Sequence, residues 1–89
     1  MPEKTLNRKG YKIRPMTYLR FLREKAGLNI PAIVQALGVD MVVYNKYEWK
    51  KMKIGAEKAQ YIYQFFVTNY PEIVPDWLTP HILQEEVEL

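Results

Sequence analysis

The sequence predicts an all-α fold, and three observations carry that prediction. Asn29 and Asp40, residue types that cap helix N-termini, each stand before a run of apolar residues at helical spacing. Gly27 and Gly38 follow such runs, where helices commonly end. Alternation of apolar and polar residues is weak and confined to residues 42–44, where the preceding cap favours a helix over a strand.

The first helix is expected over residues 16–25. Leu19 and Leu22 are three apart and so lie on one face, and Arg20 and Glu24 form an i, i+4 pair of opposite charge. The second helix is expected over residues 30–37, with a proline in its first turn, where proline is tolerated. Its inward stripe is expected to consist of Ile33, Ala36 and Leu37.

The third helix is expected over residues 41–49 and begins after the cap at Asp40. Only Gly38-Val39-Asp40 separates it from the second helix, and a three-residue turn containing glycine joins two helices at a steep angle. The fourth helix is expected over residues 56–67. Its aromatic side chains are interpreted mainly as packing residues: Tyr61, Tyr63, Phe65 and Phe66. A short last helix is expected to start at Thr79 and Pro80.

Composition excludes several classes of protein. A chain of 89 residues fits one small domain, and 48% hydrophobic residues are too many for a disordered tail. Without cysteine there is no disulfide scaffold and no cysteine-ligated zinc or iron–sulfur site. No stretch reaches the roughly 18 apolar residues of a membrane span, and no apolar leader is seen. We therefore expect a cytoplasmic protein that does not bind membranes.

Charge divides the chain into two parts. Residues 1–58 hold all 13 lysines and arginines and five acids, a net charge of +8, whereas residues 59–89 carry five acids and a charge of −5. Such asymmetry favours a polyanionic partner for the first part. We expect a basic arm over residues 1–15, a helical domain over residues 16–70 and an acidic, apolar segment over residues 71–89.

One pattern of residues points to a known family. Residues 19–24 read LRFLRE and residues 26–28 read AGL. A capped helix ending in an apolar residue follows, then Gly38-Val39, a second capping residue and a helix that closes on Glu48. This arrangement resembles the phage-repressor helix-turn-helix family, also called lambda-repressor-like or Xre/Cro type, over about residues 16–70. The resemblance implies a lambda-repressor-like, all-α domain of about five helices that binds double-stranded DNA.

In this family the second helix of the motif enters the major groove. The resemblance therefore implies that one face of residues 41–49, opposite Tyr44 and Tyr47, contacts the DNA bases. The residues of this face are Met41, Val42, Asn45, Lys46 and Trp49. Asn45 suits adenine and Lys46 suits guanine, whereas methionine and valine offer only apolar contact, for example with a thymine methyl. The resemblance also implies a structural ion pair between Arg23 and Glu48.

Two positions depart from the family. Ile30 stands where a phosphate-binding glutamine is common, and Trp49 stands where glycine or asparagine is common, so the third helix can run on. A face that is apolar and poor in hydrogen-bonding groups also suits a protein interface.

Contacts with the backbone phosphates of DNA are expected from the exposed loop lysines Lys50, Lys51 and Lys53. The basic residues of the arm either lie in a groove or make no contact: Lys4, Arg8, Lys9, Lys12 and Arg14.

The acidic segment is too apolar to remain in water, so it either closes the core or pairs with a second copy in a homodimer. No motif predicts an enzyme, a cofactor or a metal site, and His81 is expected at the surface. We expect a small, sequence-specific transcriptional regulator of phage or bacterial type, a repressor or activator that binds an operator as a dimer. The alternative is a protein-interaction module on the same fold: an antitoxin, an antirepressor or a phage inhibitor of a host protein.

Overall fold

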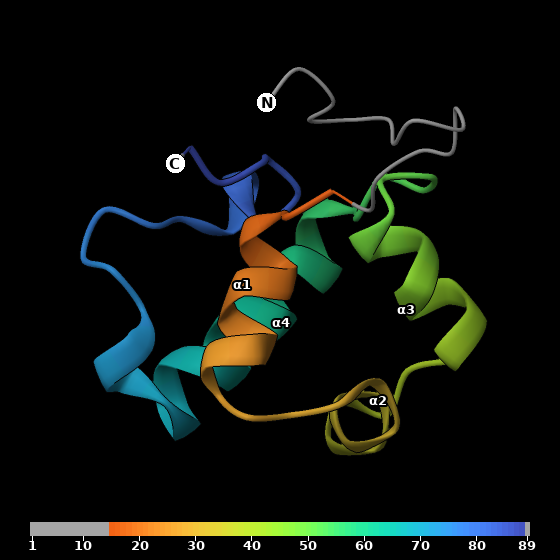
Figure 1. The fold of residues 1–89 in the computed structure, drawn as a ribbon, viewed down its shortest axis with the longest axis horizontal. Helices are drawn as coiled ribbons and strands as arrows, with labels where there is room; N and C mark the ends of the chain where they lie inside the picture. Colours follow the sequence, from red (N-terminus) through yellow and green to blue (C-terminus); the bar gives the residue numbers. More distant parts are fainter. Residues whose placement is uncertain (1–14, 89) are drawn as a thin grey trace, which may run out of the picture.

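The computed structural model describes residues 15–88, which form four α-helices and two short 3-10 helices without a named strand. The all-α prediction is confirmed for this part of the chain. The elements follow one another as α1 (Tyr18–Lys25), α2 (Ile30–Leu37), α3 (Met41–Glu48), α4 (Ala56–Asn69), η1 (Pro71–Ile73) and η2 (Pro80–Ile82). The helix α1 lies in front of α4 in Figure 1, with α2 seen end-on below α3. No helix in residues 15–88 has the length and apolar character needed to cross a membrane.

Side-chain caps set where three of the helices begin. Thr17, Asn29 and Asp40 each accept a hydrogen bond from the backbone N–H three residues later, at 3.1, 2.8 and 3.1 Å. The caps at Asn29 and Asp40 were predicted and place α2 and α3 as expected. The cap at Thr17 was not predicted, and it explains why α1 begins two residues after the expected start.

The core lies between the four helices and the C-terminal segment. Its buried hydrophobic side chains are Leu19, Leu22, Ile33, Val34, Leu37, Tyr44, Tyr47, Ile54, Ala59, Ile62, Phe66, Leu78 and Leu83. The predicted stripe of α2 was wrong at one position, because Ala36 is exposed. Val34 is buried instead, since its side chain lies beside Ile33 and Leu37 on the face that α2 turns to the core.

The C-terminal segment closes the core rather than standing away from it. Leu78 and Leu83 are 1% and 0% exposed, and η1 and η2 both pack against α4. The expected fifth α-helix is instead one turn of 3-10 helix, Pro80–Ile82. The physical reason is that the carbonyls of Leu83 and Glu85 accept from the first backbone N–H groups of α1, at 2.8 and 2.9 Å. An α-helix would join the Val87 N–H to the Leu83 carbonyl, whereas here the Val87 N–H donates to the Met16 carbonyl at 2.8 Å.

Candidate nucleic-acid interface

The turn between α2 and α3 fixes how α3 is presented. Gly38 has a φ of 71°, in the left-handed region that glycine adopts without steric cost, and its N–H donates to the Val34 carbonyl at 2.8 Å. Val39 packs against the core beyond the glycine, and Asp40 then caps α3. Figure 1 shows α2 end-on while α3 runs across the view, so the two helices cross steeply, as the short turn predicts.

One face of α3 is buried and the other is open. Tyr44 and Tyr47 point into the core, with 0% and 7% of their surface exposed. On the opposite face, Met41 and Val42 are 42% and 62% exposed, and Lys46 is exposed as well. Two more of the predicted base-facing residues are half-buried: Asn45 and Trp49. Large apolar side chains therefore stand on the surface that the sequence assigned to DNA.

Four of the predicted base-facing residues border one shallow hollow. It measures about 330 Å³ and is lined by Val42, Asn45, Lys46, Trp49 and Lys51. The Lys51 ammonium lies 5.8 Å from the centre of the Trp49 ring, a cation–π geometry. The structure thus joins one residue assigned to phosphate with residues assigned to bases. Trp49 is the C-cap of α3, so the helix does not run on past it.

The loop that follows α3, residues 49–55, exposes its lysines to solvent and is called the lysine loop below. Lys50, Lys51 and Lys53 are all exposed. Lys50 has a φ of 60°, unusual for a residue with a side chain, at the loop position after Trp49. Its ammonium also lies 3.5 Å from the Glu86 carboxylate, an exposed ion pair of the kind that contributes little stability. Lys51 and Lys53 are therefore the simpler candidates for phosphate contact.

A buried network holds α3 against α1. Arg23 donates from Nε to Glu48 Oε2 at 2.6 Å and from Nη2 to Oε1 at 3.2 Å, the bidentate geometry expected of this pair. The Tyr44 hydroxyl donates to the same carboxylate at 2.6 Å, and Arg23 also donates to the Leu28 carbonyl. Sequence reasoning placed Tyr44 in the core without its hydrogen bond, although Tyr44 and Glu48 are one helical turn apart.

The network shifts the pKa values of two of its members. Burial raises the pKa of the Tyr44 hydroxyl, and the neighbouring Glu48 charge raises it further. Burial alone would lower the pKa of Arg23, but its hydrogen bond to Glu48 and the carboxylate charge outweigh that effect and raise it. The Arg23 guanidinium therefore stays charged and the Tyr44 hydroxyl stays neutral, which keeps all these hydrogen bonds in place at neutral pH.

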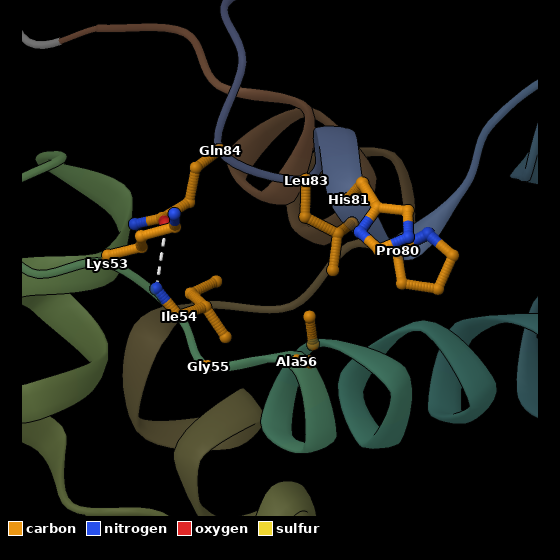
Figure 2. Close-up of a pocket in the computed structure, with 9 residues that line it drawn as sticks. Lys53, Ile54, Gly55, Ala56, Pro80, His81, Leu83 and Gln84 are labelled. Atoms are coloured by element: carbon orange, nitrogen blue, oxygen red, sulfur yellow. Dashed lines mark hydrogen bonds between the residues drawn. The ribbon is translucent and has the colours of Figure 1, made fainter.

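A residue that sequence reasoning missed joins the C-terminal segment to the lysine loop. Gln84 Oε1 accepts from the Ile54 backbone N–H at 2.8 Å, a bond drawn in Figure 2. Its Nε2 donates to the carbonyls of Tyr47 and Met52, at 3.1 and 2.7 Å. No local pattern signals these contacts, because Gln84 lies at least 30 residues from each partner.

Other predicted residues take simpler places. Of the four aromatic residues of α4, Phe66 is fully buried, but Tyr61 is half exposed and donates its hydroxyl to the Leu37 carbonyl at 2.8 Å. Ile30 packs against the core. His81 is exposed, beside a hollow of about 470 Å³ between the lysine loop and η2 (Figure 2). The basic arm, apart from Pro15, lies outside the described residues.

The arrangement offers binding chemistry. Among residues 15–88, no group of three histidines or acidic residues is placed to hold a metal ion. No protein-family model, curated protein or solved structure matches this chain. The site consists of an exposed helix face, a neighbouring loop of lysines and a buried network that fixes the helix to the core.

Proposed function

We propose that this protein is a sequence-specific DNA-binding regulator with a lambda-repressor-like helix-turn-helix domain. The observation that carries the proposal is the join between the open face of α3 and the lysine loop, which share one hollow through Trp49 and Lys51. A helix face flanked by exposed lysines suits a major groove flanked by phosphates. The steep crossing of α2 and α3 supports the same mode of docking.

In this mode α3 lies in the major groove. Asn45 pairs with an adenine edge and Lys46 reaches guanine acceptors, while Met41 and Val42 contact a thymine methyl. Lys51 and Lys53, joined by Lys50, neutralise the phosphates and set affinity without reading sequence. The regulator acts by occupying a promoter or operator, as a repressor or activator in the cytoplasm of a phage host or bacterium. We further propose that it binds as a homodimer.

The test is a fluorescence-polarisation titration of duplex DNA across salt concentrations. The wild-type affinity falls steeply with salt if lysines neutralise phosphates. Lys51→Ala lowers the slope of log K against log [salt] by about 0.9, the value for one phosphate contact. Lys25→Ala is the matched control, because each lysine lies over an aromatic ring, at 5.7 Å for Lys25 and 5.8 Å for Lys51. No binding at low salt, or equal slopes for the two variants, would refute the proposal.

A second candidate function has one observation in its favour. Met41 and Val42 expose 42% and 62% of their surface, which suits a protein partner as well as a thymine methyl. This alternative is a protein-interaction module on the same fold, such as an antitoxin, an antirepressor or an inhibitor of a host protein. The two functions can coexist, but a chain that has only this second function does not bind duplex DNA even at low salt, so the same titration tests whether the regulator function is present.

A further inference from the structure

The C-terminal segment is anchored on α1 on both sides of Gln84. The Leu83 carbonyl accepts from the Leu19 N–H at 2.8 Å, and the Glu85 carbonyl accepts from the Tyr18 N–H at 2.9 Å. The Leu83 side chain is fully buried in the core. The backbone of Gln84 is therefore held between two fixed neighbours, and its side chain extends from a firm base toward the lysine loop, as Figure 2 shows.

The Gln84 amide joins the two ends of that loop. Its Nε2 bonds the carbonyl of Tyr47, near the end of α3, and the carbonyl of Met52, in the middle of the loop. Its Oε1 bonds the N–H of Ile54, whose buried side chain leads into α4. One side chain thus uses both its donor and its acceptor groups on three backbone groups, which lie before, between and after the lysines of the loop.

The loop needs such a support. Lys50 has a φ of 60°, a conformation that residues with a side chain adopt only when their surroundings impose it. Within the loop, the Lys50 N–H donates to the Tyr47 carbonyl at 3.2 Å, a long hydrogen bond, and the Lys51 N–H donates to the Lys46 carbonyl at 2.8 Å. The bonds from Gln84 lie on both sides of this strained residue and oppose its relaxation.

We propose that Gln84 is a positioning residue of the DNA interface, which holds the lysine loop in the shape that places Lys51 and Lys53 against the phosphates. The inference rests on the proposed function and adds the C-terminal segment to it. Without the amide, the loop samples other shapes and the lysines pay an ordering cost when DNA binds. The segment that closes the core thereby also sets the affinity for DNA.

The experiment compares Gln84→Ala with Gln60→Ala, a control that removes an exposed glutamine from α4. Affinity for duplex DNA is measured at 0.1 M salt, at a temperature where circular dichroism shows every variant folded. Each phosphate contact contributes about 0.9 to the slope of log K against log [salt], and 0.1 M lies one decade below 1 M salt. We therefore expect Gln84→Ala to weaken binding by roughly eightfold for each lysine that loses its phosphate. Gln84→Met keeps the length of the side chain without its amide and is expected to weaken binding alike, which serves if the alanine variant is unstable.

A double-mutant cycle separates positioning from general destabilisation. In a background with Lys51→Ala and Lys53→Ala, Gln84→Ala is expected to weaken binding much less, because two of the positioned charges are gone. An equal loss in both backgrounds would overturn the inference. So would a wild-type chain that binds DNA and Gln84 variants that bind it equally well. A wild-type chain that does not bind DNA would instead overturn the proposed function, and this inference with it.

Discussion

Replacing Tyr44 by phenylalanine probes the buried network that joins α1 and α3. Tyr44 and Glu48 are both 0% exposed, and the phenol oxygen lies 2.6 Å from Glu48 Oε2. The substitution keeps the ring in the core and removes one hydrogen bond to a carboxylate that water does not reach. A hydrogen bond to a charged group contributes about 1.5–3 kcal/mol to stability. We therefore expect the free energy of unfolding to fall by about 2 kcal/mol.

The assay is urea unfolding followed by circular dichroism, together with thermal melting. A loss of about 2 kcal/mol lowers the Tm of a domain this size by roughly 8–16 °C. Tyr47→Phe is the matched control, because Tyr47 is buried in the same helix and no hydrogen bond joins its hydroxyl to another of the described side chains. Equal stability of the two variants would refute the reasoning, because the Tyr44 hydroxyl would then contribute no more than a hydroxyl without that bond.

Two further predictions follow from the strained loop and from the raised pKa of Tyr44. Lys50→Gly should have a free energy of unfolding about 1 kcal/mol higher than that of Lys50→Ala. Both variants lose the ion pair with Glu86, but only glycine adopts the left-handed φ without steric cost. Equal urea midpoints for the two variants would contradict this. The pKa of Tyr44 is higher in the folded state than in the unfolded chain, where tyrosine ionises near pH 10. Above about pH 10 the unfolded chain therefore loses this proton while the folded state keeps it. The free energy of unfolding should then fall by about 1.4 kcal/mol for each further pH unit. The decline should be shallower in Tyr44→Phe, measured by urea unfolding between pH 8 and pH 11, and equal declines would argue against a tyrosine origin.

Local chemistry made much of the fold predictable from the sequence. The caps at Asn29 and Asp40 act on backbone groups three residues away, so the bounds of α2 could be read from neighbouring residues alone. The glycine turn at Gly38 is equally local. The ion pair of Arg23 and Glu48, which the structure places at 2.6 Å, came from the resemblance to a family, because 25 residues separate the two.

Contacts between distant residues were beyond the reach of sequence reasoning. Gln84 stands in an acidic segment with no pattern around it, and its role appears only when the chain brings it to the lysine loop. Whether residues 71–89 close the core or pair with a second copy also depended on where Leu78 and Leu83 would lie. The left-handed Lys50 did leave a signal: it lies beside the position where the resembled family usually has glycine or asparagine.

The antiparallel contact of Met16 with Val87, 2.8 Å from carbonyl to N–H, bears on how the protein is made. The ribosome adds about 5–20 residues per second, so α1 to α4 leave it before the segment that covers them. Until residue 85 emerges, the first N–H groups of α1 lack one or both of their carbonyl partners, and until residue 83 emerges Leu19 lacks its neighbour Leu83. Completion of the native state therefore waits until residues 83–87 have left the ribosome, and a nascent chain that has emerged only as far as residue 80 has its apolar interior still open on one side.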